Sequence, residues 1–310
     1  MEKLLLIDSN AILYRAFFAL PEILTLKDKT PINAIYGFTQ MLLSFIELFN
    51  PTYVICAFDL PRPTFRDKLY ENYRAQRKPT PDNLISQIKP TKELLHTLRI
   101  PIYEKEGYEA DDIIGTLANL AQGRNLETVI ITGDRDLLQL VSAKTKVYMP
   151  VKGLAQGKLF DETEVEEKYK IHPQQMVDYK ALMGDPSDNY PGVKGIGPKS
   201  ASELITKYNS LEEIYNHLQE LSERQQKLLS DSKKNALMAK QLAQIVTDID
   251  LDLNLDQAKL RRLDTVEIKE HFDRLAFRSH WTRVKKLYTN KVKSEQADVK
   301  SNDDEQLTML

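Results

Sequence analysis

The sequence contains a single cysteine, Cys56, so no disulfide can form within the chain, as is typical of a protein from a reducing cytoplasm. It has no apolar run near the roughly 18 residues that a membrane-spanning helix needs. The opening residues do not resemble a secretory signal, because their short apolar stretch ends at the acidic Asp8. We therefore expect a cytoplasmic protein with no membrane partner.

The chain also lacks a large excess of either charge, since 43 Lys and Arg residues against 45 Asp and Glu residues give a formal net charge of −2. This balance argues against an indiscriminate polycation. It does not exclude nucleic acid, because the distribution of charge matters more than its sum. With 310 residues, the chain is long enough for one large domain and a smaller one.

Short apolar runs that end at acidic residues alternate with helical patterns over the first 150 residues. Runs of this kind are typical of strands buried in a parallel sheet. Their alternation with helices predicts an α/β domain with a mostly parallel sheet and helices on both faces. We expect strands at 4–7, 53–58, 100–103, 128–132 and 147–149, and helices at 11–20, 34–49 and 82–98.

Acidic residues follow most of these predicted strands. Ligands of such sheets collect outside the carboxyl ends of the strands, so we expect the acidic residues to lie together there. Any one of them alone is better explained as a helix cap or a turn former, and only the joint pattern favours a shared site. Seven acids belong to this group: Asp8, Asp59, Glu109, Asp111, Asp112, Asp134 and Asp136.

Such a cluster indicates metal binding. Carboxylate oxygens are the hard ligands that Mg²⁺ prefers. Without cations, clustered acids would raise one another's pKa through repulsion between like charges. Two Mg²⁺ ions about 3.5–4 Å apart clamp a phosphodiester and activate water for in-line attack. The pattern therefore predicts a two-metal phosphodiesterase site.

From about residue 172 the strand pattern gives way to helices, expected at 176–183, 199–208, 211–221 and 232–245. Before the second of them, residues 184–189 add Asp185 and Asp188. Read alone, Asp185, Pro186 and Asp188 also suit an ordinary helix start. The polar, unpatterned tail at 290–310 is predicted to be disordered or a linker.

Two further stretches indicate nucleic-acid binding. Residues 192–201 resemble a helix–hairpin–helix turn, in which Gly192, Gly195 and Gly197 allow close backbone approach and Lys194 and Lys199 add charge; a plain helix–helix loop is the alternative. Residues 61–80 carry six basic residues against two acidic ones, with aromatic residues between them, as in a single-strand groove, although a solvated amphipathic segment has the same pattern. The basic residues are Arg62, Arg66, Lys68, Arg74, Arg77 and Lys78, and the aromatic ones are Phe65, Tyr70 and Tyr73.

Taken in order, these motifs resemble the flap endonuclease (5′-nuclease) family, in particular the 5′→3′ exonuclease domain of bacterial DNA polymerase I. The resemblance runs from Leu4 to about residue 280, and the motifs together are highly specific. They are Asp8 with residues 14–19, then residues 34–38, 58–59, 65–66, 73–79, 107–112, 132–136 and 184–201.

The resemblance implies a resolvase-like (PIN-like) catalytic domain at 1–171, with a helical arch at about 66–100, and a helix–three-turn–helix DNA-binding domain at 172–289. It implies Mg²⁺ as cofactor, with Mn²⁺ as a substitute, and K⁺ at the hairpin as in some family members. One metal site would use Asp8, Asp59, Glu109, Asp111 and Asp112, and the other Asp134, Asp136, Asp185 and Asp188. In the arch and around it, Tyr73 would stack on a base, phosphates would be contacted by Arg15, Arg74 and Arg77, and other parts of the DNA by Phe65, Arg66 and Lys78. The duplex would be held by the hairpin residues Gly192, Lys194, Gly195, Gly197 and Lys199.

The expected activity is that of a 5′→3′ exonuclease and 5′-flap endonuclease acting on DNA with a 5′ flap or 5′ end, including RNA-primed DNA. A polymerase domain or polymerase partner is implied, and a stand-alone nuclease would have the same sequence features. The family usually has lysine where this chain has Arg74, whereas no member of the second acidic group is missing. A catalytically silent, structure-specific DNA-binding protein is the alternative. A small-molecule phosphatase fits less well, because residues 6–10 lack the paired Asp-x-Asp motif of haloacid-dehalogenase-type enzymes.

Overall fold

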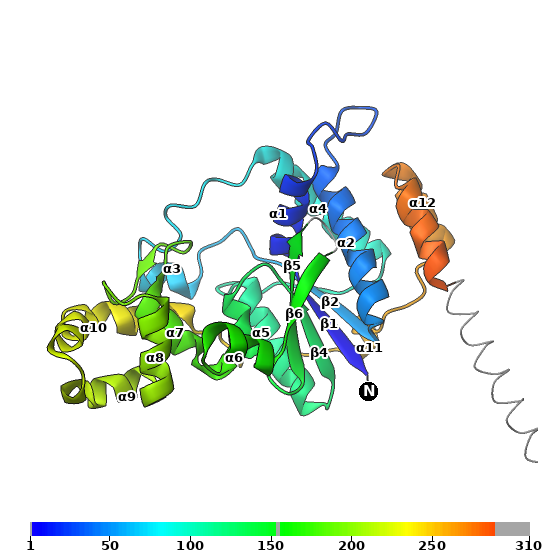
Figure 1. The fold of residues 1–310 in the computed structure, drawn as a ribbon. Helices are drawn as coiled ribbons and strands as arrows, with labels where there is room; N and C mark the ends of the chain where they lie inside the picture. The colour runs from blue at the N-terminus through cyan, green and yellow to red at the C-terminus, as the bar shows by residue number, and fades with distance from the viewer. Residues whose placement is uncertain (1, 153–155, 289–310) are drawn as a thin grey trace, which may run out of the picture.

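A six-stranded sheet forms the centre of the molecule in the computed structural model, which describes residues 2–152 and 156–288 (Figure 1). The strands lie in the order β3-β2-β1-β4-β5-β6, and every neighbouring pair is parallel except β5 and β6. This arrangement confirms the predicted mostly parallel sheet and adds the antiparallel edge strand β6. The strands are β1 (Lys3–Asp8), β2 (Tyr53–Ala57), β3 (Ile102–Tyr103), β4 (Glu127–Ile131), β5 (Thr145–Lys152) and β6 (Gln156–Phe160).

Apolar cores lie on both faces of the sheet. Because successive residues of a strand point to opposite faces, Leu4 and Leu6 of β1 pack in one core, and Leu5 and Ile7 pack in the other. Strands that are apolar at every position suit a sheet covered on both sides, as predicted from their composition. The first core includes α5 (Ala110–Gly123), and the second includes α1 (Ser9–Ala19), α2 (Asn33–Phe49) and α4 (Asp82–Thr97).

The order of the strands reverses beside β1, which has β2 on one side and β4 on the other. In open α/β sheets the ligand crevice lies at such a switch point, outside the carboxyl ends of the strands. Asp8 is the last residue of β1, and Asp59 and Asp134 follow β2 and β4. The topology therefore brings acids from separate parts of the sequence to one edge.

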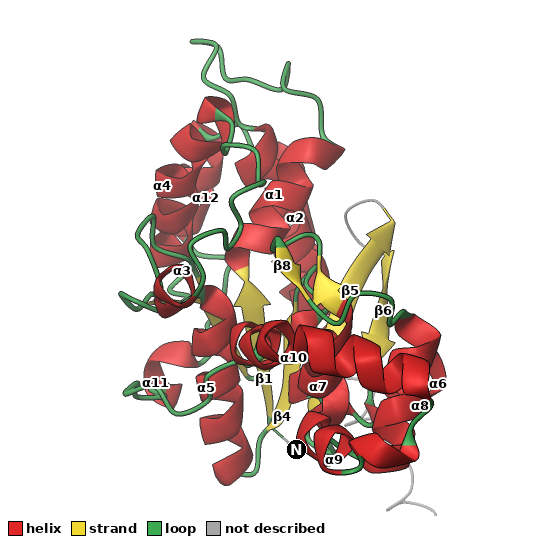
Figure 2. Ribbon diagram, turned by 90° about the vertical axis from the view of Figure 1, so that its left-hand side faces the viewer, coloured by secondary structure: helices red, strands yellow, loops and turns green. Residues whose placement is uncertain are grey.

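A helical part of the chain follows α6 (Glu162–Tyr169) (Figure 2). Its last long helix begins at Glu223 and not at Ser232, because Ser222 caps it and accepts a hydrogen bond from the backbone N–H of Gln225. Its helices are α7 (Met176–Met183), α8 (Pro198–Tyr208), α9 (Leu211–Asn216) and α10 (Glu223–Ala243).

The helix start considered for residues 184–189 is wrong. These residues form the turn of a small hairpin between β7 (Gly184–Asp185) and β8 (Tyr190–Pro191). The side chain of Asp185 accepts hydrogen bonds from the backbone N–H and the hydroxyl of Ser187, which favours a turn over a helix.

The chain after α10 returns to the sheet. Residues 245–284, which we predicted as part of the second domain, cross α5 and β2 and place α12 (Val266–Arg274) beside α4 (Figure 2). Ile245, Leu253 and Ala258 join the core that contains α5, whereas later residues such as Phe272 and Phe277 join the core that contains α1 and α2. Gly115 permits the crossing, because a Cβ atom there would lie 2.6 Å from Cγ2 of Ile245.

No helix among the described residues is long and apolar enough to cross a membrane. The tail predicted at 290–310 lies outside the described residues.

Candidate active site

A cavity of about 870 Å³ opens at the carboxyl edge of the sheet. One part of its wall is acidic, and it is formed by the last residue of β1, by residues that follow β2 and β4, and by the start of α5. Another part is basic and comes from residues 74–81, which precede α4. The acidic residues are Asp8, Asp59, Glu109, Asp111 and Asp134, the basic ones are Arg74, Arg77 and Lys78, and α1 adds Asn10, Ala11, Tyr14 and Phe18.

Asp8 is held rigidly where β1 meets α1. It caps α1 by accepting a hydrogen bond from the backbone N–H of Ala11 at 3.0 Å, and it accepts another from the hydroxyl of Thr132 at 2.7 Å. Burial, reinforced by repulsion from Asp59, raises the pKa of Asp8 to about 7. The two hydrogen bonds fix the carboxylate while the fold holds it beside other acids.

Glu109 and Asp111 lie at the start of α5. Burial raises the pKa of Glu109 to about 7, although Arg74 and Arg66 oppose the shift. Burial and then repulsion from Asp134 raise the pKa of Asp111 well above its usual range. This crowding of buried carboxylates is the situation that a bound cation relieves.

Asp136 and Asp185 form a second acidic group, and Lys180 of α7 makes an ion pair with each of them. Burial, followed by repulsion from Asp134, raises the pKa of Asp136 to about 7. Burial also disfavours ionisation of Asp185, but hydrogen bonds from Lys180 and Ser187 outweigh it and lower the pKa of Asp185. Lys180 therefore joins an acid of the sheet domain to an acid of the helical domain.

Asp188 is held by the segment that precedes α4. Its carboxylate accepts a hydrogen bond from the hydroxyl of Tyr73 at 3.0 Å and pairs with Arg74 and Arg77. Arg74 also donates to Glu109 at 2.7 Å. The predicted base stacking by Tyr73 does not fit this geometry, because its ring is buried in an apolar cluster with residues of α7 and α10.

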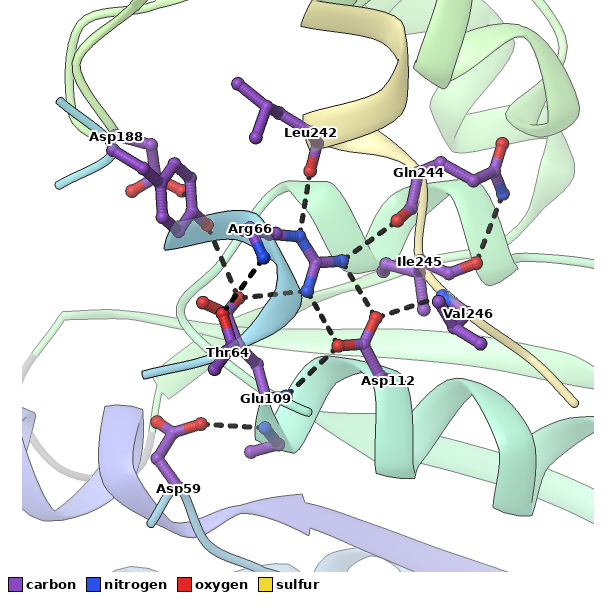
Figure 3. A network of polar contacts seen from close by, with 12 residues as sticks. Asp59, Thr64, Arg66, Glu109, Asp112, Asp188, Leu242, Gln244, Ile245 and Val246 are labelled. Carbon is purple, nitrogen blue, oxygen red and sulfur yellow. Dashed lines mark hydrogen bonds and ion pairs between the residues drawn. The ribbon is translucent and has the colours of Figure 1, made fainter. Parts of the chain in front are cut away.

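Two further predictions require correction. Arg66 was expected at the DNA surface and Asp112 among the metal ligands, but both are buried and point toward one another (Figure 3). The Arg66 guanidinium makes a bidentate contact with Asp112, at 2.6 Å and 2.8 Å. Asp112 does not line the cavity. Arg66 thus belongs to a basic stretch of the sequence but is buried, because it pairs with the buried Asp112.

The remaining predicted DNA contacts are divided between surface and interior. Phe65 is half-buried, with its ring centroid 6.0 Å from that of Tyr108, and Gly192 is buried against the backbone of residues 182–184. Arg15 is half-buried on α1 and is not part of the cavity wall. At the hairpin, Lys194, Gly195 and Lys199 are exposed, and Gly197 caps α8.

Sequence reasoning missed the roles of Tyr14, Phe18 and Lys180. Tyr14 and Phe18 line the cavity from α1, and the Phe18 side chain is 70% exposed. Their signal was an aromatic pair four residues apart, on one helical face directly after Asp8. Lys180 had no signal in the sequence, because its partner Asp136 lies 44 positions earlier along the chain.

No three His, Cys, Asp or Glu side chains in the described part of the chain are arranged as a ready set of metal ligands. These acids are engaged by basic side chains instead. Arg74 pairs with Glu109, Arg77 pairs with Asp188, and Lys180 pairs with both Asp136 and Asp185. The donors themselves are hard carboxylate oxygens crowded in a buried edge, which is the chemistry suited to Mg²⁺. The residue types therefore fit a divalent ion, while their arrangement here is organised by basic side chains.

An acidic cavity at the switch point of a resolvase-like sheet, followed by a helical domain, defines the architecture of this chain. Two family models match it: the 5′-3′ exonuclease N-terminal resolvase-like domain over residues 3–170, and the 5′-3′ exonuclease C-terminal SAM fold over residues 171–266. The chain belongs to the 5′-3′ exonuclease family, as the resemblance implied.

Relatives and solved structures agree with this assignment. The chain is 45% identical over 279 residues to DNA polymerase I of Caldicellulosiruptor bescii, covering 89% of this chain and 33% of that protein. It is 41% identical over 288 residues to DNA polymerase I of Chloroflexus aurantiacus, covering 92% of this chain and 30% of that protein. The chain thus spans about a third of the length of these curated relatives.

Two solved structures share the fold. A zinc-bound T5 5′-exonuclease has a TM-score of 0.67 at 20% identity, covering 79% of this chain and 90% of that one. The catalytic core of Rad2 in complex with DNA substrate has a TM-score of 0.62 at 19% identity, covering 93% of this chain and 91% of that one. These likenesses confirm the fold predicted from the sequence.

Proposed function

We propose that the chain is a divalent-metal-dependent nuclease, with the 5′→3′ exonuclease and 5′-flap endonuclease activities expected from the sequence. One observation carries the proposal: carboxylates from four separate segments line one cavity whose other wall is basic. A phosphodiester needs both features, cations held by the acids and positive side chains that bind the phosphate.

Four acids of the cavity wall, Asp8, Asp59, Glu109 and Asp111, would hold one ion. Asp134, Asp136, Asp185 and Asp188 would hold the second. When bound, Mg²⁺ supplies an activated water and neutralises charge on the phosphate. We propose Mg²⁺ as the ion used, with Mn²⁺ as a substitute.

The chain's own side chains would orient the substrate. Arg74 and Arg77 line the cavity and are already held by Glu109 and Asp188, so their guanidinium groups are placed beside the acidic wall. Lys78 adds a charge on the same segment. The rings of Tyr14 and Phe18 offer apolar surface on which a base of the single strand would stack.

The duplex would lie on the hairpin before α8. Lys194, Gly195 and Lys199 are exposed there, and the first backbone N–H groups of α8 point toward the N-terminal end of the helix, where the hairpin lies. We propose that these groups hold phosphates of the duplex without reading its sequence, and that K⁺ binds at the same hairpin.

The proposed substrate is DNA with a 5′ flap or 5′ end, including RNA-primed DNA. The relatives named DNA polymerase I support a polymerase partner, either on the same chain or as a separate protein. A catalytically silent DNA-binding protein remains the alternative outcome of the test.

The test is incubation of the chain with a labelled 5′-flapped duplex, with Mg²⁺ or with EDTA. We expect cleavage near the junction only with Mg²⁺, and loss of cleavage in Asp134→Ala with binding retained in Ca²⁺. Asp252→Ala is the control, because this side chain is 85% exposed and lies outside the cavity wall. Binding without cleavage by the parental chain would favour the silent DNA-binding protein. Activity on a small phosphate ester alone would favour a phosphatase.

A further inference from the structure

Arg66 makes an unusually complete set of contacts for a charged residue that is 2% exposed (Figure 3). A guanidinium has five N–H donors. Nε donates to the carbonyl of Leu242 at 2.9 Å, and Nη2 donates to the carbonyl of Gln244 at 2.9 Å and to Asp112. Nη1 donates to Asp112 and lies 3.4 Å from Oε2 of Glu109. The guanidinium therefore makes four hydrogen bonds, and an ion-pair contact with Glu109 completes its surroundings.

Asp112 is as fully used on its side of the pair. Its side chain is fully buried, and beyond Arg66 it accepts hydrogen bonds from the backbone N–H of Val246 at 3.0 Å and of Glu109 at 3.1 Å. Gln139 adds to the same junction, since it donates to the carbonyl of Ala243 at 2.9 Å and accepts from the N–H of Ile245 at 3.0 Å.

Three segments that are distant in the sequence meet at this pair. Arg66 belongs to α3 (Phe65–Leu69), at the base of the predicted arch, and Asp112 belongs to the first turn of α5, next to Glu109. Residues 242–246 are the point where the chain leaves α10, which packs along α7. The helical domain and the arch base are thus both tied to the turn of α5 that carries Glu109 into the cavity.

A buried ion pair contributes little to stability compared with apolar packing, but it tolerates few arrangements, because breaking it leaves a buried charge without a partner. We propose that Arg66 is a positioning residue: its pair with Asp112 fixes the positions of the helical domain, the arch base and Glu109 relative to one another. This inference rests on the proposed nuclease function and names no contact between Arg66 and DNA. The alternative is that the pair only stabilises the fold.

The two possibilities are separated by removing both charges together. Arg66→Gln alone leaves the buried Asp112 without its basic partner, and we expect this variant to unfold at much lower urea concentration than the parent. In Arg66→Gln/Asp112→Asn, the amides keep a donor and acceptors without a buried charge, so the urea midpoint should recover. The glutamine of this double variant is too short to span the new asparagine and both backbone carbonyls, so these relative positions are no longer fixed.

The decisive measurement is single-turnover cleavage of a 5′ flap with Mg²⁺ at saturating protein, beside the affinity for the flap in Ca²⁺. For a positioning residue, the folded double variant cleaves on the order of 10²-fold more slowly, with affinity little changed, since a misplacement near 1 Å is enough for such a loss. Arg283→Met is the matched control, because Arg283 ties the returning chain to Ser44 and Glu47 of α2, away from the cavity. It should lower the urea midpoint and leave the rate at saturation unchanged.

A folded double variant that cleaves at the parental rate would overturn the inference. If the double variant does not fold, Arg66→Lys decides in its place, because lysine keeps the charge and loses the planar fork. Parental cleavage by a folded Arg66→Lys variant would then be the refuting result, and a slower rate with unchanged affinity the supporting one. A parental chain that does not cleave refutes the proposed function itself, and this inference with it.

Discussion

Lys180→Met tests whether a basic side chain stands in for a cation between the sheet domain and the helical domain. The Lys180 side chain is 16% exposed, and those of its partners Asp136 and Asp185 are 12% and 11% exposed. Ion pairing with Asp136, after the opposing effect of burial, raises the pKa of Lys180, so it is charged at neutral pH. Methionine keeps most of the side-chain volume and removes the charge.

The expected loss of stability follows from this burial. Removing one partner of a buried ion pair typically costs about 3–5 kcal/mol. Asp185 keeps its hydrogen bonds from Ser187, so we expect the lower end, about 3 kcal/mol in metal-free buffer. For a chain of this size, that corresponds to a fall in Tm on the order of 5–10 °C.

Mg²⁺ should reverse part of this loss, because the acids freed from Lys180 are then available to the ion. If the variant binds Mg²⁺ tenfold more tightly than the parent, saturating Mg²⁺ stabilises it by about 1.4 kcal/mol more than the parent. Thermal unfolding with EDTA and with a Mg²⁺ series measures this difference directly.

Lys240→Met is the matched control. Lys240 also pairs with two acids, but these are Asp178 and Glu212, which do not belong to either group of proposed metal ligands. We expect it to lower Tm with no extra stabilisation by Mg²⁺. Equal Mg²⁺ effects on the two variants, or none on Lys180→Met, would refute the reasoning.

Three other substitutions test separate parts of the structure. Arg74→Ala should lower the single-turnover rate of flap cleavage at saturation by about 10²–10³-fold, because stabilisation of charge on the phosphate is lost, whereas Arg74→Lys should keep most of the rate. If Arg74→Ala cleaves at the parental rate, Arg74 is a binding contact only. Gly195→Asp should weaken duplex binding in a filter or anisotropy assay more than Gly195→Ala does. Both substitutions strain a backbone with φ of +92°, but only aspartate adds negative charge. Equal losses of binding affinity in the two variants would exclude a nearby phosphate. Gly115→Ala should destabilise the protein by about 1–3 kcal/mol in urea, since its Cβ would meet Ile245, while Gly123→Ala, with open space around it, should not.

Much of the fold follows from local patterns in the sequence. Apolar runs such as 4–7 and 128–132 have no polar face, so they predict strands buried on both sides of a parallel sheet. The topology of such sheets then places Asp8, Asp59 and Asp134 at one edge, without any knowledge of contacts. The structure confirms that these three line one cavity with Glu109 and Asp111.

The sequence also determined the helical second half, but not its extent. The sequence predicts α7 and α8 closely. The apolar positions of α8 repeat on one face, whereas α7 is buried at most of its positions. Residues 245–284 show no sign in the sequence of returning to the sheet, since their apolar residues would suit either domain. Only tertiary packing decides which core each of them joins: Ile245 and Leu253 pack in the core that contains α5, and Phe272 and Phe277 pack in the core that contains α2 and α4.

Tertiary structure alone decided which charged residues face the cavity and which are buried. Arg66 and Asp112 look like their neighbours in a basic and an acidic stretch, yet they pair with each other across 46 positions. The carbonyls of Leu242 and Gln244 that complete the site for Arg66 lie 176 and 178 positions away. A charge enters the interior only where all of its partners converge, and that convergence depends on contacts between segments that no local pattern records.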